Sequence, residues 1–287
     1  MTLTGRDRWI PYLFLAPVLV LLGVFRLVPA FVGMRESVYT SFLGVERFVG
    51  FDNFAFIFAD PIFWDSVSLT LIFSVIINPL QTVLALALAL VANQALRGAS
   101  ILRSVWLLPV AVSINVTVLV WGLMLDTDGG LINGILSHLA VDPIPWLTSP
   151  TTALSSIMVL ISWKGVFFWM IFFLAALQAI PRAIEDAAAI DGASTWQTII
   201  RVKVPMLRNV ILFVLVADTV INFLQFAPPL ILTDGGPLNS TNLLMHEVYR
   251  RGFLFGDLGS SSAMTMVLLG IVLTVVAVEF ALFRRGR

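Results

Sequence analysis

The sequence contains no cysteine, and only 12% of its 287 residues are charged. The missing cysteine excludes disulfides, cysteine-ligated metal sites and thiol catalysis. The formal net charge is zero at pH 7, so net charge indicates no nucleic-acid partner. Hydrophobic residues make up 59% of the chain, against roughly half in an ordinary globular domain. The composition therefore predicts an integral membrane protein whose main partner is a lipid bilayer.

Sequence motifs of enzymes are missing as well. There is no G-x-x-x-x-G-K-[ST] loop to hold nucleotide phosphates and no G-x-S-x-G turn to present a serine nucleophile. The only two histidines, His138 and His246, fall in different predicted loops, and neither belongs to an H-E-x-x-H zinc motif. We therefore expect a chain that is not an enzyme and that holds no metal or cofactor itself.

Long apolar stretches recur along the whole chain. A membrane helix needs about 20 mostly apolar residues. Six stretches meet this requirement, namely Ile10–Phe31, Val67–Val91, Ser104–Leu125, Ala153–Leu177, Val210–Leu232 and Ala263–Phe283. We therefore predict an all-α membrane protein with six transmembrane helices, organised as a single domain over residues 1–287.

Basic residues are distributed unequally between the loops that join these spans. With the N-terminus placed in the cytoplasm, 4 lysines and arginines fall outside and 11 fall inside, which are Arg6, Arg8, Arg97, Arg103, Arg182, Arg201, Lys203, Arg208, Arg284, Arg285 and Arg287. Cytoplasmic loops carry the excess of Lys and Arg in membrane proteins. We therefore predict that both termini, and the segment 180–205, are cytoplasmic.

The first predicted outer segment, residues 32–66, contains an aromatic-rich run. Phe51, Phe54, Ile57 and Phe58 would share one face of a helix. A helix with such a face typically lies in the membrane interface. We therefore predict an amphipathic interfacial helix here, in preference to a ligand site.

Two ionisable residues lie deep in predicted spans, Lys164 in the fourth and Asp218 in the fifth. Charges inside a membrane are costly and usually mark function. The two side chains could pair with each other, or they could face a water-filled cavity and meet a polar solute. The sequence leaves both readings open.

A polar stripe runs along the fifth predicted span. Asp218, Asn222 and Gln225 are spaced four and three residues apart, so they share one helix face. Such a stripe either bonds to neighbouring helices or lines a solute path, and three long polar side chains favour the path. In the fourth span Phe168 lies near Gly165, and its ring could stack on a sugar or simply pack in a core.

The segment Ile180–Pro205 is too polar to span a membrane and too regular to be a loose loop. Its alanines favour a helix over Ala183–Ile190, which Asp191-Gly192 would end. Ser194 would open a second short helix, with Gln197 three residues later as in a capping box. This exposed helix–turn–helix predicts a contact with another protein.

The same segment resembles the EAA signature of the permease subunits of binding-protein-dependent ABC importers. The matching residues are Asp186-Ala187-Ala188, with Glu185 one place earlier, then Asp191-Gly192-Ala193 and Pro205. Three further stretches are similar to the maltose and glycerol-phosphate branch of that family. They are FVGFDNF after the first span, TDGG in the second outer loop and TDGGPLNST after the fifth span.

The resemblance implies a type I importer permease fold in a bacterial or archaeal cell membrane. It implies a heterodimer with a second permease, two cytoplasmic ATPases that bind ATP and Mg²⁺, and a solute-binding protein outside. The residues expected to couple to an ATPase are Glu185, Asp186, Ala187, Ala188, Asp191, Gly192, Ala193 and Pro205. Family position adds Gly165, Phe168, Asn222 and Gln225 to the solute path, beside Lys164 and Asp218.

Lys164 suggests an anionic solute such as a glycerol or sugar phosphate, while the branch as a whole implies a sugar or a sugar-like solute. A different class of transporter also fits the residues. An ion-coupled secondary transporter would use Lys164 and Asp218 as its relay and would need no ATPase.

Overall fold

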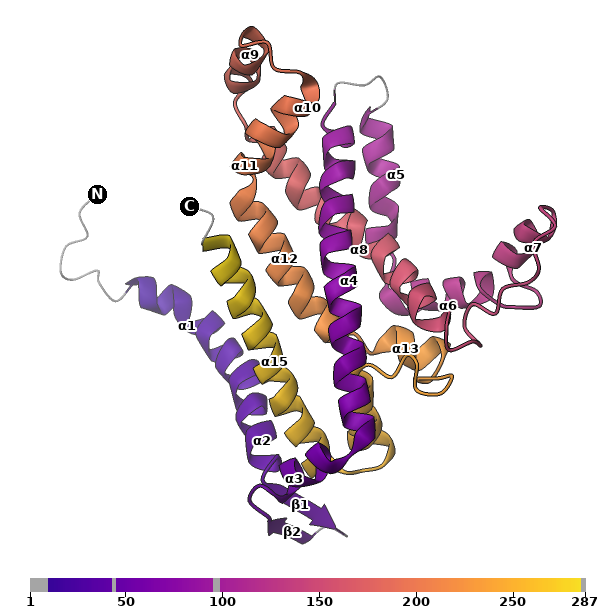
Figure 1. Cartoon of the computed structure of the whole chain (residues 1–287). Helices are drawn as coiled ribbons and strands as arrows, with labels where there is room; N and C mark the ends of the chain where they lie inside the picture. Colours follow the sequence, from indigo (N-terminus) through magenta and orange to yellow (C-terminus); the bar gives the residue numbers. More distant parts are fainter. Residues whose placement is uncertain (1–9, 43–44, 95–98, 285–287) are drawn as a thin grey trace. The chain divides into compact units, whose positions relative to one another are not determined.

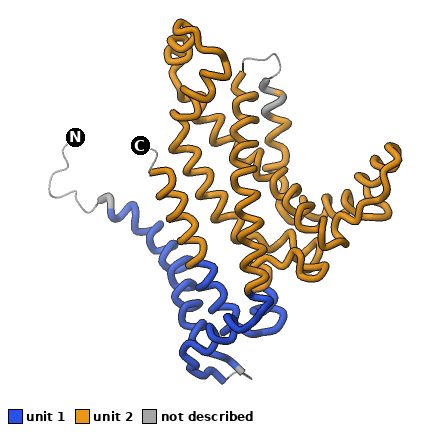
Figure 2. Tube along the Cα trace, in the orientation of Figure 1, with its two compact units in different colours: residues 1–63, 248–269 blue, residues 64–247, 270–287 orange. Residues whose placement is uncertain are grey.

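The computed structural model describes residues 10–42, 45–94 and 99–284. These residues form two compact units (Figure 2). The first unit comprises the described residues of Met1–Phe63 together with Val248–Leu269, and the second comprises those of Trp64–Glu247 together with Gly270–Arg287. The single-domain organisation stays a prediction.

The first unit begins with a long apolar helix. α1 (Ile10–Leu22), a π-helical turn (Gly23–Leu27) and α2 (Val28–Glu36) follow one another directly. The stretch Tyr12–Glu36 has 25 residues with a mean hydropathy of 2.3, which is long and apolar enough to cross a bilayer. The predicted first span lies within this helix, which continues beyond it to Glu36.

A two-stranded hairpin follows α2, and the all-α prediction did not include it. β1 (Tyr39–Phe42) pairs antiparallel with β2 (Val45–Phe48), and Tyr39 stands opposite Phe48. Their rings meet edge to face with centroids 5.4 Å apart, a cross-strand pair of the kind that stabilises sheets. Strands of four residues were missed because they are too short to show a clear alternation in the sequence.

α3 (Asp52–Ala59) forms where the interfacial helix was predicted, and its apolar side chains differ in burial. Ile57 is fully buried, whereas Phe51 and Phe58 are 77% and 45% exposed. The buried Asn53 fixes the helix, because its Nδ2 donates to two carbonyl oxygens of the preceding chain at 2.9 and 2.8 Å. Ile57 thus packs inside the unit while Phe51 and Phe58 stay exposed, and the place of this helix in a membrane interface stays a prediction.

The second unit contains three long helices, α4 (Pro61–Ala92, whose first turn belongs to the first unit), α8 (Ala153–Gln178) and α12 (Arg208–Phe223) (Figure 1). Ala85 and Ala89 of α4 are fully buried in a cluster with Met170 and Phe173 of α8 and Val214 of α12. Small residues at a helix contact allow close approach of the backbones, which drives packing in membranes.

The predicted third span, Ser104–Leu125, is not one straight helix. α5 (Ala99–Ala111) and α6 (Ile114–Met124) are separated by two residues, and the apolar parts of the pair are bent by 101°. Ser113 is extended and caps α6 by accepting from the N–H of Val116 at 3.4 Å. Among the described residues, five helices are therefore long and apolar enough to cross a membrane, or six if the bent pair forms one span.

Shorter elements connect the long helices. Their bounds are α7 (Leu131–Ser137), α9 (Arg182–Ile190), α10 (Thr195–Thr198), a π turn (Ile199–Lys203), α11 (Val204–Met206), α13 (Ala227–Leu232), α14 (Leu244–Tyr249) and a further π turn (Arg250–Leu254). The last helix, α15 (Leu258–Arg284), begins in the first unit and ends in the second.

The turn between α9 and α10 has the local structure that its sequence predicts. Gly192 adopts a φ of +77°. The N–H of Gly192 donates to Ala189 O at 3.1 Å and that of Ala193 to Ala188 O at 3.0 Å, which is the Schellman ending of a helix. Ser194 and Gln197 then form a complete capping box at the start of α10.

The predicted orientation rests partly on residues outside those described, namely Arg6, Arg8, Arg97, Arg285 and Arg287. The side chain of Arg103 is not described either. The cytoplasmic location of the termini and of α9–α10 therefore stays a prediction.

The start of α15 gives a test of the first unit. A Cβ at Gly259 would lie 2.5 Å from Tyr39 O and 2.8 Å from Asn53 Nδ2. Overpacking of this kind costs about 1–3 kcal/mol, so Gly259→Ala should lower the thermal unfolding midpoint of the purified protein. The matched control is Gly270→Ala in the same helix, where a Cβ meets nothing within 4 Å. Equal midpoints for the two variants would contradict this packing.

Candidate binding site in the second unit

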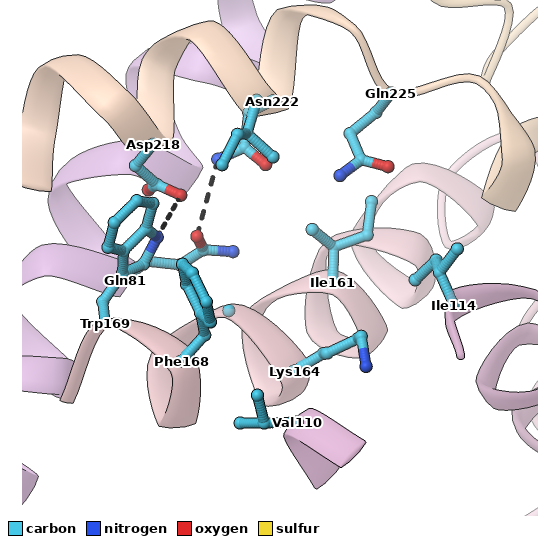
Figure 3. Close-up of a pocket in the computed structure, with 12 residues that line it drawn as sticks. Gln81, Val110, Ile114, Ile161, Lys164, Phe168, Trp169, Asp218, Asn222 and Gln225 are labelled. Carbon is cyan, nitrogen blue, oxygen red and sulfur yellow. Dashed lines mark hydrogen bonds between the residues drawn. The ribbon is translucent and has the colours of Figure 1, made fainter. Parts of the chain in front are cut away.

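A cavity of about 390 Å³ lies among α4, α5, α6, α8 and α12 (Figure 3). It is lined by all six residues predicted for a solute path, namely Lys164, Gly165, Phe168, Asp218, Asn222 and Gln225. Gln81 and Trp169 also line it, and the remaining wall consists of the aliphatic side chains of Val110, Ile114, Ile161 and Ile221. The structure thus brings the polar residues of the fourth and fifth predicted spans to one place.

Helical spacing explains why these side chains converge. Four residues of α8 that line the cavity are adjacent or three residues apart along the helix, namely Ile161, Lys164, Gly165 and Phe168. They therefore share the face that lines the cavity. On α12, and at Gln225 just after its end, the stripe predicted from the sequence faces back toward α8, as Figure 3 shows for the labelled side chains.

The buried carboxylate of Asp218 is held by neutral donors. Trp169 Nε1 donates to Asp218 Oδ1 at 2.6 Å. With the amide nitrogen of Gln81 turned toward Asp218, that nitrogen donates to both carboxylate oxygens at 2.7 and 2.9 Å. We assign this orientation because the opposite one would place an amide oxygen against a carboxylate. In this orientation the 3.5 Å contact between Asn222 Nδ2 and the Gln81 oxygen is lost; Figure 3 draws that contact as a dashed line.

Gly165 leaves the space that Gln81 occupies. A Cβ at this position would lie 2.7 to 2.9 Å from the three terminal atoms of the Gln81 amide. The glycine therefore allows Gln81 of α4 to reach across α8 to Asp218. Sequence reasoning missed Gln81, although it is a polar residue within an apolar span, three positions after Asn78.

Asn222 belongs to a chain of hydrogen bonds that links three helices. Its Nδ2 donates to Asn78 Oδ1 at 2.7 Å, and Asn78 Nδ2 donates to Thr219 Oγ1 at 2.8 Å. Thr219 in turn donates to Glu279 Oε1 at 2.7 Å. Asp218 and Asn222 are each 1% exposed, so both bond to neighbouring helices as well as lining the cavity. No side-chain hydrogen bond to Gln225 occurs within the described part of the chain.

Lys164 does not pair with Asp218, so the pairing alternative is wrong. Its Nζ donates to the backbone oxygens of Pro109, at 2.9 Å, and Val112. These two carbonyls lie on either side of the α5 end, beside the break in the third predicted span. No carboxylate pairs with Lys164 in the ranges that the structure covers, which leaves its charge uncompensated at the cavity wall.

The aromatic residues of α8 divide between two faces. Phe168 lines the cavity, and its ring meets Trp169 edge to face with centroids 4.8 Å apart. Trp163 faces elsewhere, in a cluster with Trp121 and Phe167. Trp169 is only 3% exposed, so Phe168 supplies the aromatic face that a molecule in the cavity would contact.

The α9–α10 segment carries the second set of predicted residues. Glu185 Oε2 forms an ion pair with Lys203 Nζ at 2.9 Å, which ties α9 to the turn that leads into α11 and α12. Ile190 and Trp196 are 86% and 67% exposed, so this segment presents apolar side chains as well as its small residues. Pro205 lies in the single turn of α11.

Metal ligands are not grouped in the described residues. No three or more His, Cys, Asp or Glu side chains there could hold a metal ion together. Neither the cavity nor the α9–α10 segment therefore offers a metal centre from this part of the chain.

Known proteins similar in sequence to this chain match it over nearly its whole length. The sn-glycerol-3-phosphate transport system permease protein UgpA of Shigella flexneri is 33% identical over 284 residues, which cover 96% of this chain and 94% of UgpA. The protein of the same name from Yersinia pestis is 33% identical over 282 residues, covering 96% and 95%. No family model matches the chain.

Solved structures share the fold. A chain of a bacterial ABC transporter involved in the import of the acidic polysaccharide alginate superposes with a TM-score of 0.83 at 23% identity, covering 98% of this chain and 96% of the other. The same transporter in complex with an alginate pentasaccharide-bound periplasmic protein gives the same score. With identity above 30% over nearly the whole length of UgpA, this chain belongs to the family of ABC importer permeases that includes the sn-glycerol-3-phosphate permeases.

Proposed function

We propose that this chain is one of two permease subunits that together form the translocation path of an ATP-driven importer. One observation carries the proposal. The cavity lies between α8 and α12, which are the two helices that flank the α9–α10 segment. A movement of that segment would therefore act on both walls of the cavity at once.

The solute we propose is a small hydroxylated anion, such as a polyol or sugar phosphate. Lys164 supplies a charge that no carboxylate neutralises in the described residues, and the Gln225 amide is open to bond hydroxyls. Phe168 supplies an apolar face for carbon atoms. The named solute of UgpA is a phosphate ester and the polysaccharide of the alginate transporter is acidic, which agrees with a cationic cavity wall.

Energy would reach the cavity through α9. The sequence has no nucleotide-binding loop, so ATP and Mg²⁺ would be bound by two partner ATPases. A groove on one ATPase would take the α9–α10 segment with its small residues and the exposed Ile190 and Trp196. The Glu185–Lys203 ion pair would then pass the movement to α12. Transport requires that ATP and the solute bind the inward-open and outward-open states with different affinities.

The remaining partners follow from the same family. A second permease would complete the path as a heterodimer in a bacterial or archaeal cell membrane. A solute-binding protein would deliver the solute to the outer loops. The relay of an ion-coupled transporter has no support in the geometry, because Lys164 bonds to backbone oxygens and Asp218 to Trp169 and Gln81.

The turn at Gly192 tests the coupling role. Gly192 has a φ of +77°, and a Cβ there would meet nothing within 4 Å, so a side chain at this position acts through the backbone alone. Valine strongly disfavours this conformation, and Gly192→Val should abolish stimulation of the ATPase by loaded binding protein in the reconstituted importer. Gly192→Asn is the matched control, because asparagine tolerates a positive φ. Full stimulation in the valine variant would refute the coupling role.

The contact between Gly165 and Gln81 tests the solute site. Gly165→Ala should displace the Gln81 amide from Asp218 and leave a buried carboxylate short of donors, which costs about 1–3 kcal/mol. We expect ATP-dependent uptake into proteoliposomes to fall about 5- to 150-fold, since each 1.4 kcal/mol corresponds to a factor of ten. Gly134→Ala, where a Cβ meets nothing within 4 Å, should leave uptake unchanged. Equal uptake by both variants would count against the site.

The charge of Lys164 tests the solute class. A charge-assisted hydrogen bond contributes about 1.5–3 kcal/mol, so Lys164→Met should weaken uptake of sn-glycerol-3-phosphate about 10- to 100-fold. Uptake of the neutral solute glycerol should change less, so the ratio of the two is the readout. Lys164→Arg keeps the charge and should keep the ratio near its original value. A ratio that is the same with Met as with Lys would exclude recognition of an anion by this residue.

A further inference from the structure

The break in the third predicted span has an unusual set of hydrogen bonds. In a continuous helix the N–H of Val116 would donate to Val112 O, four residues earlier. Here Ser113 Oγ accepts from the Val116 N–H at 3.4 Å instead. Val112 O accepts from Lys164 Nζ. Both partners of the lost backbone bond are therefore satisfied by side chains.

A second backbone carbonyl at the break also lacks its helical donor and accepts from Lys164 instead. Pro109 O would accept from the N–H of Ser113 in a continuous helix. It accepts from Lys164 Nζ at 2.9 Å. The last carbonyls of a helix lack partners and carry the negative end of its dipole, so an ammonium group is a favourable cap. In a membrane no water is available to take over these bonds.

We propose that Lys164 is a positioning residue that holds the third span in its bent form by capping the end of α5. The bend shapes the cavity directly, because Val110 and Ile114 line it from the two arms. The capping role stands without any particular solute, whereas its effect on solute binding rests on the proposed function. An ammonium has three N–H donors, so two carbonyl bonds leave one for a bound solute.

The chain allows a direct measurement of the bend because it contains no cysteine. Ile101 on α5 and Leu123 on α6 are 72% and 77% exposed. Spin labels on cysteines at these two positions report the distance between the arms in the purified importer complex. At about 1.5 Å per residue, a straight helix would separate the two Cα atoms by about 33 Å. Two equal arms bent by 101° would separate them by about 21 Å.

Lys164→Met should shift the distance distribution toward the longer value, since two carbonyls lose their donor. Lys164→Arg should keep the short distance, because the guanidinium also donates to carbonyls. The matched control is Lys203→Met, which removes the chain's other lysine, in the π turn Ile199–Lys203, and should leave the distance unchanged. A short distance that persists in Lys164→Met would overturn the proposal.

If the methionine variant yields no complex, Lys164→Gln decides the question. Glutamine keeps N–H donors but is shorter and uncharged, so the long-distance population should rise part of the way. An unchanged distribution in that variant would also overturn the proposal. The spectra are recorded without solute, so they do not depend on the solute class. A changed solute ratio with an unchanged distance would support anion recognition and remove the capping role.

Discussion

The rest of the structure depends on one constraint, which is that polar groups inside a bilayer have to satisfy one another. α4, α8 and α12 contribute Gln81, Trp169 and Asp218 to a single group of hydrogen bonds. Asn222 extends a second chain of bonds through Asn78 to Thr219. These contacts fix how the three helices face each other, since apolar side chains alone would pack almost equally well against lipid.

The same constraint explains why the structure agrees with some predictions from the sequence and differs from others. Hydropathy placed the long helices well, because a span of apolar residues has few alternatives to a membrane helix. It did not show the break in the third span, because Ser104–Leu125 is apolar enough throughout to look continuous. The break depends on donors from outside that segment, and Lys164 is about fifty residues away in the chain. A local pattern cannot show such a partner.

The candidate site was predictable in part for a similar reason. Spacing predicts one helix face for Asp218, Asn222 and Gln225, and all three line the cavity, although α12 ends at Phe223 and Gln225 follows it. Periodicity gives the faces of one helix but not the neighbour that each face meets. The sequence therefore left open whether Lys164 and Asp218 pair with each other or face a cavity. Gln81 was missed because its role depends on the space left by Gly165 on another helix.

A solute that enters this cavity would meet groups that are already bonded. Asp218 and Asn222 have protein partners, whereas Gln225 and one N–H of Lys164 are open. A solute would then bind first to Gln225 and Lys164. It could form hydrogen bonds with Asp218 or Asn222 only if the helices moved and the present bonds were broken. Those bonds join α12 to α4 and α8. Exchanging them for bonds to a solute would loosen the contact between α8 and α12, the two helices that α9 would connect to an ATPase in the proposed importer. Solute binding and helix movement would in this way share one set of hydrogen bonds, and each would affect the free energy of the other.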